Sequence, residues 1–351
     1  MTTTPPPHRP LLTTLGLAVL DEIHFGNGTT AHNILGGSGS YCTAGARLFS
    51  PEPTNISWQV HAGTDFPRAI ESQLNSWGIN LRLRKSADRL STRGLLVYED
   101  DTFGAKSFRY TTPVHQVEPS DLVDTPMLNA RAIHILASPE KLMSQVEQLS
   151  DLRRNADYAT GPQNTESMII WEPAPLSCLP ENLSACFDAA RVVDVFSPNH
   201  IELLQLFGIP SILFDRTVVE SLAAAFLKSG VGKAGKGVIV VRASEHGCLI
   251  MGEGVAAVWQ GPYYDSKYAG CETGKIADTT GAGNAFLGGF AVGCDLTGDL
   301  REAGRFGSVA ASLMVEQVGL PKMSVDPSTG MELWNGDDPR KRLEALRGRD
   351  N

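Results

Sequence analysis

The sequence predicts an α/β protein built around a mostly parallel sheet, and three observations support this prediction. Apolar segments of strand length alternate along the 351 residues with segments of helical periodicity. The stretch KGVIVVRAS at 236–244 is rich in β-branched residues, which is typical of a parallel strand buried on both faces. A glycine-rich turn at 281–283 precedes a helix that is apolar nearly all round and is therefore predicted to be buried.

In the first half of the chain, each of two predicted strands leads into a predicted helix. The strands are at 11–20 and 56–63, and the helices lie within 36–50 and 67–79. Residues 81–110 break this alternation, because NLRLRKS, RGLLVYED and KSFRY have the pattern of antiparallel strands joined by turns. We therefore expect a small sheet outside the main domain.

In the second half, the alternation of strands and helices resumes. The predicted strands are at 131–137, 168–173, 191–198 and 236–244, and the predicted helices are at 139–154, 200–208, 221–230 and in two segments from 285 onward. We expect residues 1–10 to form a flexible tail and residues 326–351 to form a C-terminal extension. Residues 11–325 are expected to form a single domain, with a β lid built mainly from about 21–35 and 81–115.

The composition argues against several classes of protein. Charged residues make up only 20% of the chain, the net charge is −9, and no basic stripe with interleaved aromatic residues occurs, so direct binding of nucleic acid is not expected. No apolar run is long enough to span a membrane, and the N-terminus MTTTPPPHRP lacks the apolar core of a secretory signal. The expected location is therefore cytoplasmic, with the six cysteines reduced.

The turn before the predicted buried helix has the features of an anion site. The first N–H groups of a helix have no partner within the helix and lie at the positive end of its dipole. Because Gly281, Ala282 and Gly283 are small, an anion can approach the backbone closely there. Asp278 and Thr279 add polar atoms just before the turn. The alternative is a glycine-rich turn that packing alone requires.

Two other positions combine polar side chains with the ends of predicted elements. Asn199 and Glu202 stand three residues apart at the start of a helix, where an amide and a carboxylate suit a hydrated Mg²⁺ ion that bridges phosphates. The same pair also has the pattern of a helix capping box. Asp21 ends a buried strand, where open α/β sheets bind ligands, and it either accepts hydrogen bonds from hydroxyl groups or forms a turn.

The segment DTTGAGNAFLGGF at 278–290 resembles the second signature of the ribokinase (PfkB) family of small-molecule kinases, D-T-x-G-A-G-D. Five more segments are similar to family motifs in the same order: GLAVLD, GGSGSYCTAGARL, HAGTDFP, SPNHIELLQLFG and VIVVRASEHGCLI. The resemblance covers residues 11 to 320 in rough terms. The segments WEPAP, SPNHIELL and FLGGF, together with Asn284, are similar to the fungal Mak-type branch of the family.

This resemblance implies a ribokinase-like three-layer fold, with a mostly parallel central sheet and a small β lid, and ATP-dependent phosphorylation of a small molecule with Mg²⁺. The N–H groups of Gly281, Ala282 and Gly283 are implied to hold the transferring phosphoryl group. The residues implied to bind the acceptor are Asp21, Gly36, Gly37, Tyr41 and Asp65. Those implied to bind the nucleotide are Asn199, Glu202, Arg242, Ser244, Gly247, Asp278 and Thr279, with Glu202 also at the metal. A monovalent cation near Asp278 and a homodimer formed through the lids are further implications.

The sequence departs from the family pattern at four positions. Asn284 takes the place of the Asp that removes the proton of the acceptor hydroxyl, and an amide cannot act as that base. Tyr41 replaces an Asn that contacts the sugar, which favours an acceptor with an apolar or aromatic face. Ser244 replaces the first Gly of the nucleotide turn. Arg242, two residues earlier, either adds positive charge beside the phosphates or lies at the surface.

Two functions are consistent with these observations, and a third is weaker. The first is a Mg·ATP-dependent kinase acting on a hydroxyl of a sugar, nucleoside or other alcohol, with activity slowed or altered by Asn284. The second is a catalytically inactive, nucleotide-binding pseudokinase that acts as a sensor or scaffold. The third, a dinucleotide-dependent oxidoreductase, is weaker because the glycine run at 36–39 lacks the required spacing and ribose-binding acid.

Overall fold

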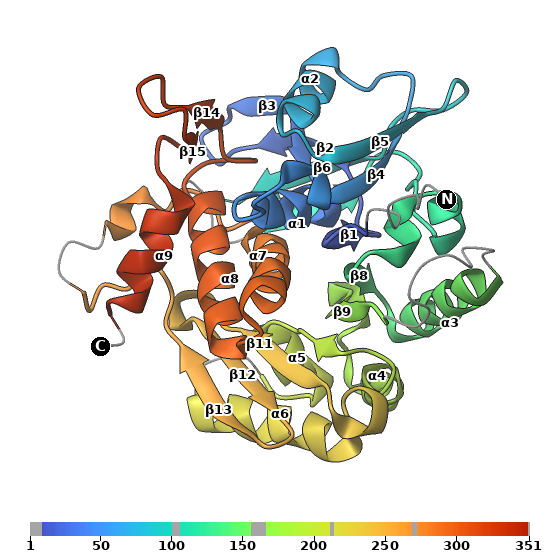
Figure 1. Cartoon of the computed structure of the whole chain (residues 1–351), viewed down its shortest axis with the longest axis vertical. Helices are drawn as coiled ribbons and strands as arrows, with labels where there is room; N and C mark the ends of the chain where they lie inside the picture. Colours follow the sequence, from blue (N-terminus) through green and yellow to red (C-terminus); the bar gives the residue numbers. More distant parts are fainter. Residues whose placement is uncertain (1–8, 100–105, 156–165, 211–213, 269–271, 350–351) are drawn as a thin grey trace, which may run out of the picture. The chain divides into compact units, whose positions relative to one another are not determined.

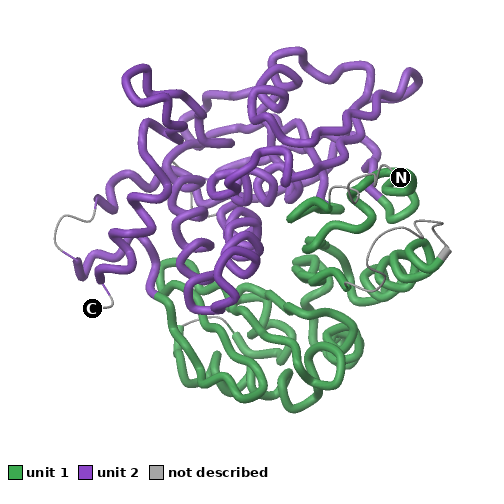
Figure 2. Tube along the Cα trace, viewed as in Figure 1, with its two compact units in different colours: residues 1–15, 118–260 green, residues 16–117, 261–351 purple. Residues whose placement is uncertain are grey.

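The computed structural model describes residues 9–99, 106–155, 166–210, 214–268 and 272–349. The chain divides into two compact units, which Figure 2 distinguishes by colour. The first unit consists of Met1–Leu15 and Glu118–Gln260, and the second unit consists of Gly16–Val117 and Gly261–Asn351. Most of the predicted flexible tail, residues 1–8, lies outside the described residues.

The first unit is built on a mostly parallel sheet (Figure 1). Among the described residues this sheet has seven strands in the order β1-β8-β9-β10-β11-β12-β13. Their bounds are β1 Leu12–Thr14, β8 Ala132–Ala137, β9 Met168–Pro173, β10 Val195–Phe196, β11 Val238–Arg242, β12 Cys248–Gly252 and β13 Val255–Gln260. In this sheet, β1, β8, β9, β10 and β11 pair in parallel, and β12 and β13 add an antiparallel edge. The predicted parallel sheet is thus confirmed.

Helices of the first unit bury apolar side chains against this sheet. Their bounds are α3 Pro139–Asn155, α4 Leu183–Ala190, α5 His200–Leu206 and α6 Arg216–Ser229. In α6, Phe226 packs against Phe196 of β10, with ring centroids 4.6 Å apart. Phe196 in turn lies 4.8 Å from Trp171 of β9, and all three side chains are buried. These aromatic contacts form part of the hydrophobic core of the unit.

The second unit contains a small sheet, here called the lid sheet, with strand order β3-β2-β6-β7. Its strands are β2 Val19–His24, β3 Thr30–Gly36, β6 Arg93–Tyr98 and β7 Lys106–Tyr110. β2 pairs antiparallel with β3 and parallel with β6, and β7 pairs antiparallel with β6. All five residues of β7, at one edge of the lid sheet, are exposed.

One predicted strand pairs differently from our expectation. β5 (Asn80–Lys85) does not join the lid sheet but pairs in parallel with β4 (Ser57–Ala62) in a separate two-stranded sheet. Helix α2 (Arg68–Ser76) connects these two strands. A helical crossover returns the chain in the direction of the first strand, which makes parallel pairing the natural result. The alternating pattern identified a strand but not its partner, and the prediction of antiparallel pairing was wrong.

Helix α7 (Ala282–Thr297) is the predicted buried helix. Its residues 285–293 are buried, and it packs against α1 (Ser38–Arg47) and α8 (Leu300–Met314), as Figure 1 shows. β14 (Met323–Val325) lies just before the expected C-terminal extension, which contains β15 (Glu332–Trp334) and α9 (Pro339–Arg347), and α9 packs on α8.

The chain has no candidate membrane helix in the parts that the structure describes, because none of its helices there is both long and apolar enough. The described cysteines are free thiols: Cys42, Cys178, Cys186 and Cys248 are buried and Cys294 is half-buried. Cys271 lies outside the described residues.

Candidate active site

The predicted anion turn lies at the N-terminus of α7, in the second unit. Gly281, the residue before the helix, has a φ of 77° in the left-handed region, which favours glycine. Asp278 Oδ1 accepts hydrogen bonds from the Thr280 N–H at 2.9 Å and the Thr280 hydroxyl at 2.7 Å, which fixes the loop into the turn. Asn284 is the third residue of the helix and is half-buried.

The backbone N–H groups of the turn are only partly used by the protein. The Ala282 N–H donates to Thr279 O at 3.3 Å, so its predicted role in holding a phosphoryl group competes with this bond. The Gly281 and Gly283 N–H groups make no hydrogen bond to another described residue. These two donors, at the positive end of α7, are therefore the best placed for an anion.

Tyr41 of α1 lies directly against the turn. A Cβ atom on Gly281 would be 2.2 Å from a carbon of the Tyr41 ring, so the ring and the glycine backbone are in contact. Tyr41 is buried, and burial raises its pKa, with the charges of Asp278 and Asp21 adding to the rise. The structure thus brings the predicted acceptor residue Tyr41 together with the predicted phosphate turn.

The carboxylate of Asp21, in β2, lies closely against two glycines, Gly36 and Gly94. A Cβ on Gly36 would be 2.0 Å from Asp21 Oδ2, and a Cβ on Gly94 would be 2.5 Å from Asp21 Oδ1 and 2.4 Å from the Phe108 ring. Asp21 is only 8% exposed, and its Oδ1 has no hydrogen-bond partner among the described residues. Burial raises the pKa of Asp21 to about 7. A buried carboxylate oxygen without a donor is costly, and an acceptor hydroxyl would supply that donor.

The other predicted acceptor residues support this arrangement. Gly37 has a φ of 92° and begins α1. Both oxygens of Asp65 are already bonded, Oδ1 to the Ser91 N–H at 2.7 Å and Oδ2 to the Arg93 guanidinium at 2.5 Å. Asp65 therefore holds the start of β6, the strand that carries Gly94, and its direct contact with an acceptor stays a prediction.

The sequence analysis assigned no role to Gly94, Phe108 and Lys106. The Lys106 ammonium donates to the Thr280 hydroxyl at 2.6 Å and lies 3.6 Å from Asp278 Oδ1. These residues lie in β6 and β7, where the sequence shows an alternating strand pattern without a motif. No signal in the sequence indicated that β7 reaches the turn.

In the first unit, Asn199 and Glu202 form a capping box at the start of α5. The Glu202 N–H donates to Asn199 Oδ1 at 2.8 Å, and the Asn199 N–H donates to Glu202 Oε2 at 2.7 Å. The capping alternative is therefore observed. It does not exclude a ligand role, because Glu202 Oε1 takes part in neither bond.

Arg242, at the end of β11, is buried among acidic groups and does not lie at the surface. Its guanidinium donates to Glu172 Oε1 at 2.7 Å, to Ser197 O at 2.9 Å and to Glu202 Oε2 at 3.5 Å. Burial raises the pKa of Glu202, and the charge of Arg242 opposes this rise. Glu172 also contacts the ring of His134, with Oε2 3.1 Å from Nε2. The alternative that Arg242 is a surface residue is wrong, because the Arg242 side chain is buried and neutralises two buried carboxylates.

Ser244 and Gly247 form the turn between β11 and β12. Ser244 has a φ of 51° and Gly247 a φ of 87°, and the Gly247 N–H donates to Ser244 O at 3.1 Å. The left-handed backbone at Ser244 is a conformation that glycine adopts more easily, so the serine here is mildly strained.

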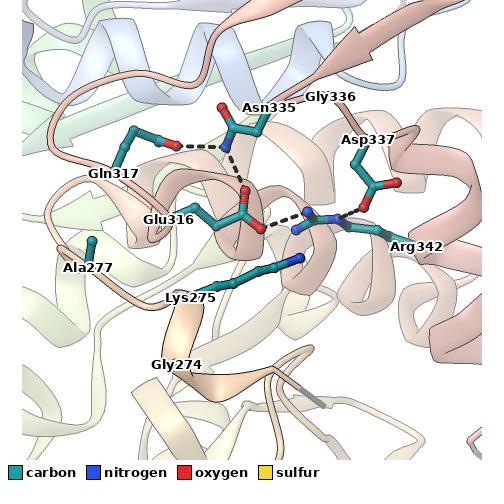
Figure 3. Close-up of a pocket in the computed structure, with 9 residues that line it drawn as sticks. All are labelled: Gly274, Lys275, Ala277, Glu316, Gln317, Asn335, Gly336, Asp337 and Arg342. Carbon is teal, nitrogen blue, oxygen red and sulfur yellow. Dashed lines mark hydrogen bonds and ion pairs between the residues drawn. The ribbon is translucent and has the colours of Figure 1, made fainter. Parts of the chain in front are cut away.

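Figure 3 shows a separate pocket of about 860 Å³ in the second unit. Several of its polar groups pair with one another: Arg342 donates to Glu316 at 2.7 Å and to Asp337 at 2.6 Å, and the Asn335 amide donates to Glu316 and Gln317 at 2.6 Å each. The pocket contains none of the predicted site residues. We interpret this network as the attachment of the C-terminal extension to the end of α8.

A divalent metal has few protein ligands available. Among the described residues, no group of three or more His, Cys, Asp or Glu side chains is arranged to hold a metal ion. Mg²⁺ usually keeps several waters and takes one or two carboxylates together with substrate phosphates. The single carboxylate oxygen Glu202 Oε1 fits that kind of site.

Comparison with known proteins gives consistent results. Residues 14–325 match the pfkB family carbohydrate kinases. The chain is 34% identical over 342 residues to an uncharacterized protein of Schizosaccharomyces pombe, covering 94% of this chain and 91% of that protein. It is 30% identical over 341 residues to Protein MAK32 of Saccharomyces cerevisiae, covering 93% and 89%. These two relatives confirm the predicted fungal branch.

Solved structures confirm the ribokinase-like fold. Ribokinase from Giardia lamblia superposes with a TM-score of 0.70 at 18% identity, covering 98% of this chain and 100% of that one. A candidate ribokinase II from E. coli, in complex with ATP and Mg²⁺, has a TM-score of 0.64 at 17% identity, covering 96% and 99%. With the match over residues 14–325, these observations lead to one conclusion: the chain belongs to the pfkB family of carbohydrate kinases.

Proposed function

We propose that this protein transfers the terminal phosphoryl group of ATP to a hydroxyl group of a small molecule, with Mg²⁺. The observation that supports this most is the turn before α7, where the N–H groups of Gly281 and Gly283 make no bond to another described residue. Membership of the pfkB family supports the reaction type, and the related structure with ATP and Mg²⁺ supports the cofactors.

In the proposed reaction, the acceptor oxygen forms a bond to the terminal phosphorus of ATP. The bond from that phosphorus to its bridging oxygen breaks, ADP leaves, and the hydroxyl proton passes to solvent water. Mg·ATP supplies the phosphoryl group and the metal charge that offsets the phosphate oxygens. The turn residues hold the phosphoryl oxygens through main-chain donors, which is electrostatic stabilisation without proton transfer.

The acceptor is proposed to bind at Asp21. Its buried Oδ1 lacks a donor among the described residues, so a hydroxyl of the acceptor would satisfy it. The Phe108 ring and Asp21 both lie beside Gly94, and Tyr41 contacts Gly281 and interacts electrostatically with Asp21. These rings favour an acceptor that combines hydroxyl groups with an apolar face, such as a nucleoside or another ring-bearing alcohol.

Nucleotide contacts are proposed for each unit by itself: for Asp278 and Thr279 in the second unit, and for a group of residues in the first unit. That group comprises Asn199, Glu202, Arg242, Ser244 and Gly247. Within it, Glu202 Oε1 is the proposed contact to the hydrated Mg²⁺ ion. Arg242 is proposed to hold Glu202 in place, because their side chains are 3.5 Å apart and both are buried.

Asn284 decides how fast the proposed enzyme works. An amide orients a hydroxyl but accepts no proton, and loss of a general base typically costs about 10²–10⁴-fold in rate. Because the transition state of phosphoryl transfer is loose, proton removal comes late, and slow transfer survives.

Replacing Asn284 tests the proposal. We expect Asn284→Asp to raise turnover at least about 10²-fold on the best acceptor of a panel of sugars, nucleosides and polyols, measured as ADP release. Asn284→Ala is the matched control, since it removes the amide without adding a base. If wild type and Asn284→Asp both bind Mg·ATP but are equally inactive on every acceptor, the kinase proposal is contradicted.

A second variant tests the turn itself. Gly283→Val places a branched side chain beside the free N–H groups, and we expect it to abolish the thermal stabilisation by Mg·ATP. Gly274→Val is the control for the substitution itself, because no atom lies within 4 Å of its added Cβ and its φ is not in the left-handed region. An unchanged ATP affinity in folded Gly283→Val would remove the turn from the proposal.

Asn284 specifically favours one other function, that of a nucleotide-binding pseudokinase serving as a sensor or scaffold. This function predicts Mg·ATP binding with no turnover in wild type or in Asn284→Asp. Absence of Mg·ATP binding in wild type would reject both functions together.

Two predictions on assembly and ions belong to this proposal. Among the described residues, β7 lies at one edge of the lid sheet and its five residues are exposed, which suits pairing of two lids into a homodimer. Sedimentation velocity tests this prediction. A monovalent cation near Asp278 predicts that turnover rises with potassium concentration at constant ionic strength.

A further inference from the structure

Lys106 is the charged side chain that the lid sheet places at the anion turn. Its ammonium donates to the Thr280 hydroxyl at 2.6 Å and lies 3.6 Å from Asp278 Oδ1. It also lies 5.4 Å from the centre of the Tyr98 ring, and the Tyr98 hydroxyl is 3.3 Å from Thr280 Oγ1. Lys106 thus contacts the residue directly before Gly281, whose N–H group makes no bond to another described residue.

The charge balance of the turn requires such a cation. Asp278 is almost fully buried directly before the turn, and its carboxylate repels any phosphate that approaches the Gly281 and Gly283 N–H groups. Lys106 offsets that charge. The family pattern has an acid at the position of Asn284, and the amide adds no second negative charge. The charges of Asp278 and Lys106 therefore cancel, and the main-chain N–H donors determine the electrostatic potential at the turn.

The chemistry of the lysine side chain allows it to move to a ligand. An ammonium has three donors on a flexible stem. Thr280 accepts from one of them, and the Lys106 side chain is still 27% exposed. A phosphoryl group at the turn would lie next to this ammonium and could take its remaining donors.

We propose that Lys106 is a catalytic residue of the proposed kinase, whose ammonium binds the transferring phosphoryl group at the turn and neutralises its charge in the transition state. This inference rests on the proposed function. In the reaction written above, Lys106 exchanges no proton, and it acts through charge on the phosphoryl oxygens. It offers a source of rate enhancement in a site where an amide, Asn284, stands in place of the usual base.

A phosphoryl mimic tests this without knowledge of the acceptor. Mg·ADP with aluminium fluoride imitates the transferring group, and its binding is measured as the thermal shift beyond that of Mg·ADP alone. We expect wild type to show the additional shift, Lys106→Met to lose it while retaining the Mg·ADP shift, and Lys106→Arg to recover part of it. Arg109→Met, on the same exposed strand, is the charge-matched control and should behave like wild type.

Turnover provides the second readout. With any acceptor that supports ADP release, we expect Lys106→Met to lower kcat about 10²–10³-fold and to change the KM for ATP by less than tenfold. Tighter Mg·ATP binding in Lys106→Met with an unchanged fluoride shift would instead identify Lys106 as a latch that closes the turn, and would overturn the proposal.

The outcomes separate this inference from the proposed function. If wild type and Lys106→Met gain the same additional shift from aluminium fluoride, only the role of Lys106 is rejected. If wild type binds Mg·ADP but gains nothing from aluminium fluoride, the turn does not hold a phosphoryl group, and the inference is rejected. If wild type binds neither Mg·ADP nor Mg·ATP, the proposed function fails and the inference fails with it.

Discussion

Two buried carboxylates, Asp21 in the second unit and Glu202 in the first, have opposite surroundings. Burial raises the pKa of both. Glu202 has the Arg242 guanidinium and the Asn199 N–H within hydrogen-bond distance, whereas Asp21 Oδ1 has no partner among the described residues. The comparison indicates that the charge of Glu202 is compensated within the protein, whereas Asp21 Oδ1 is left without a donor among the described residues. Substitutions at these positions should therefore change stability in opposite directions.

The largest expected effect is at Arg242. Arg242→Met leaves Glu172 and Glu202 buried without their counter-charge, and such breakage typically costs about 3–5 kcal/mol. Urea denaturation at pH 7 measures the free energy of unfolding. Adding Glu172→Gln and Glu202→Gln to the variant should recover part of the loss. A cost below about 1 kcal/mol would show that the network does not neutralise these charges.

The next effect, at Asp21, has the opposite sign. Its pKa is about 7 in the folded protein against an ordinary value of 3.8, so the folded protein keeps this proton where the unfolded chain has lost it. The free energy of unfolding therefore falls as the pH rises from about 4 to about 7 and then stays level. Asp21→Asn lacks this part of the slope and should be more stable than wild type at pH 8 by about 2–4 kcal/mol.

The control for this prediction is the same pair of proteins at pH 4, where Asp21 is protonated in the folded state and the difference should largely vanish. Equal pH slopes for wild type and Asp21→Asn would mean that Asp21 has a counter-charge, and the comparison with Glu202 would no longer hold.

A smaller effect is expected at Gly36. Gly36→Ala puts a methyl group 2.0 Å from Asp21 Oδ2, and overpacking of this kind typically costs about 1–3 kcal/mol. The same substitution in an Asp21→Ala background should cost much less, because the obstructing oxygen is absent. Thermal denaturation of the four proteins gives the coupling energy. If the stability costs of the Gly36 and Asp21 substitutions are additive, the strain caused by the added methyl group does not come from Asp21.

The smallest expected effect is at Asn199. Asn199→Ala removes the N-cap of α5 and should cost about 1 kcal/mol, whereas Asn199→Asp keeps the acceptor oxygen and most of the stability. Equal stability losses in the two variants would argue against the capping role. Weaker Mg·ATP binding by a stable Asn199→Asp would show that the residue also acts on the nucleotide.

Much of the fold followed from local patterns. The β-branched stretch at 238–242 and the apolar stretch at 285–293 were identified because a strand or helix buried on all sides must be apolar on all sides. The partner of β5 was not identified, because pairing depends on the crossover through α2 and not on the composition of the strand.

The candidate site was predicted unevenly. Gly281 lies against Tyr41, and Gly36 lies against Asp21, while the binding roles of these residues stay predictions. The sequence left open whether Arg242 is exposed or buried, because a charged residue at the end of a strand gives the same local pattern in both cases. Glu172, its strongest partner, lies 70 positions away in the chain, and no local pattern relates the two residues.

The sequence by itself determined the family, the order of the elements and the turn before α7, because each depends on residues that are neighbours along the chain. Only the tertiary structure decided that Asp21 Oδ1 lacks a partner among the described residues, that Arg242 pairs with two carboxylates, and that Lys106 reaches Thr280 across 174 positions. The physical reason is that desolvation and charge pairing depend on which groups fold together in space, and a linear pattern does not contain that distance.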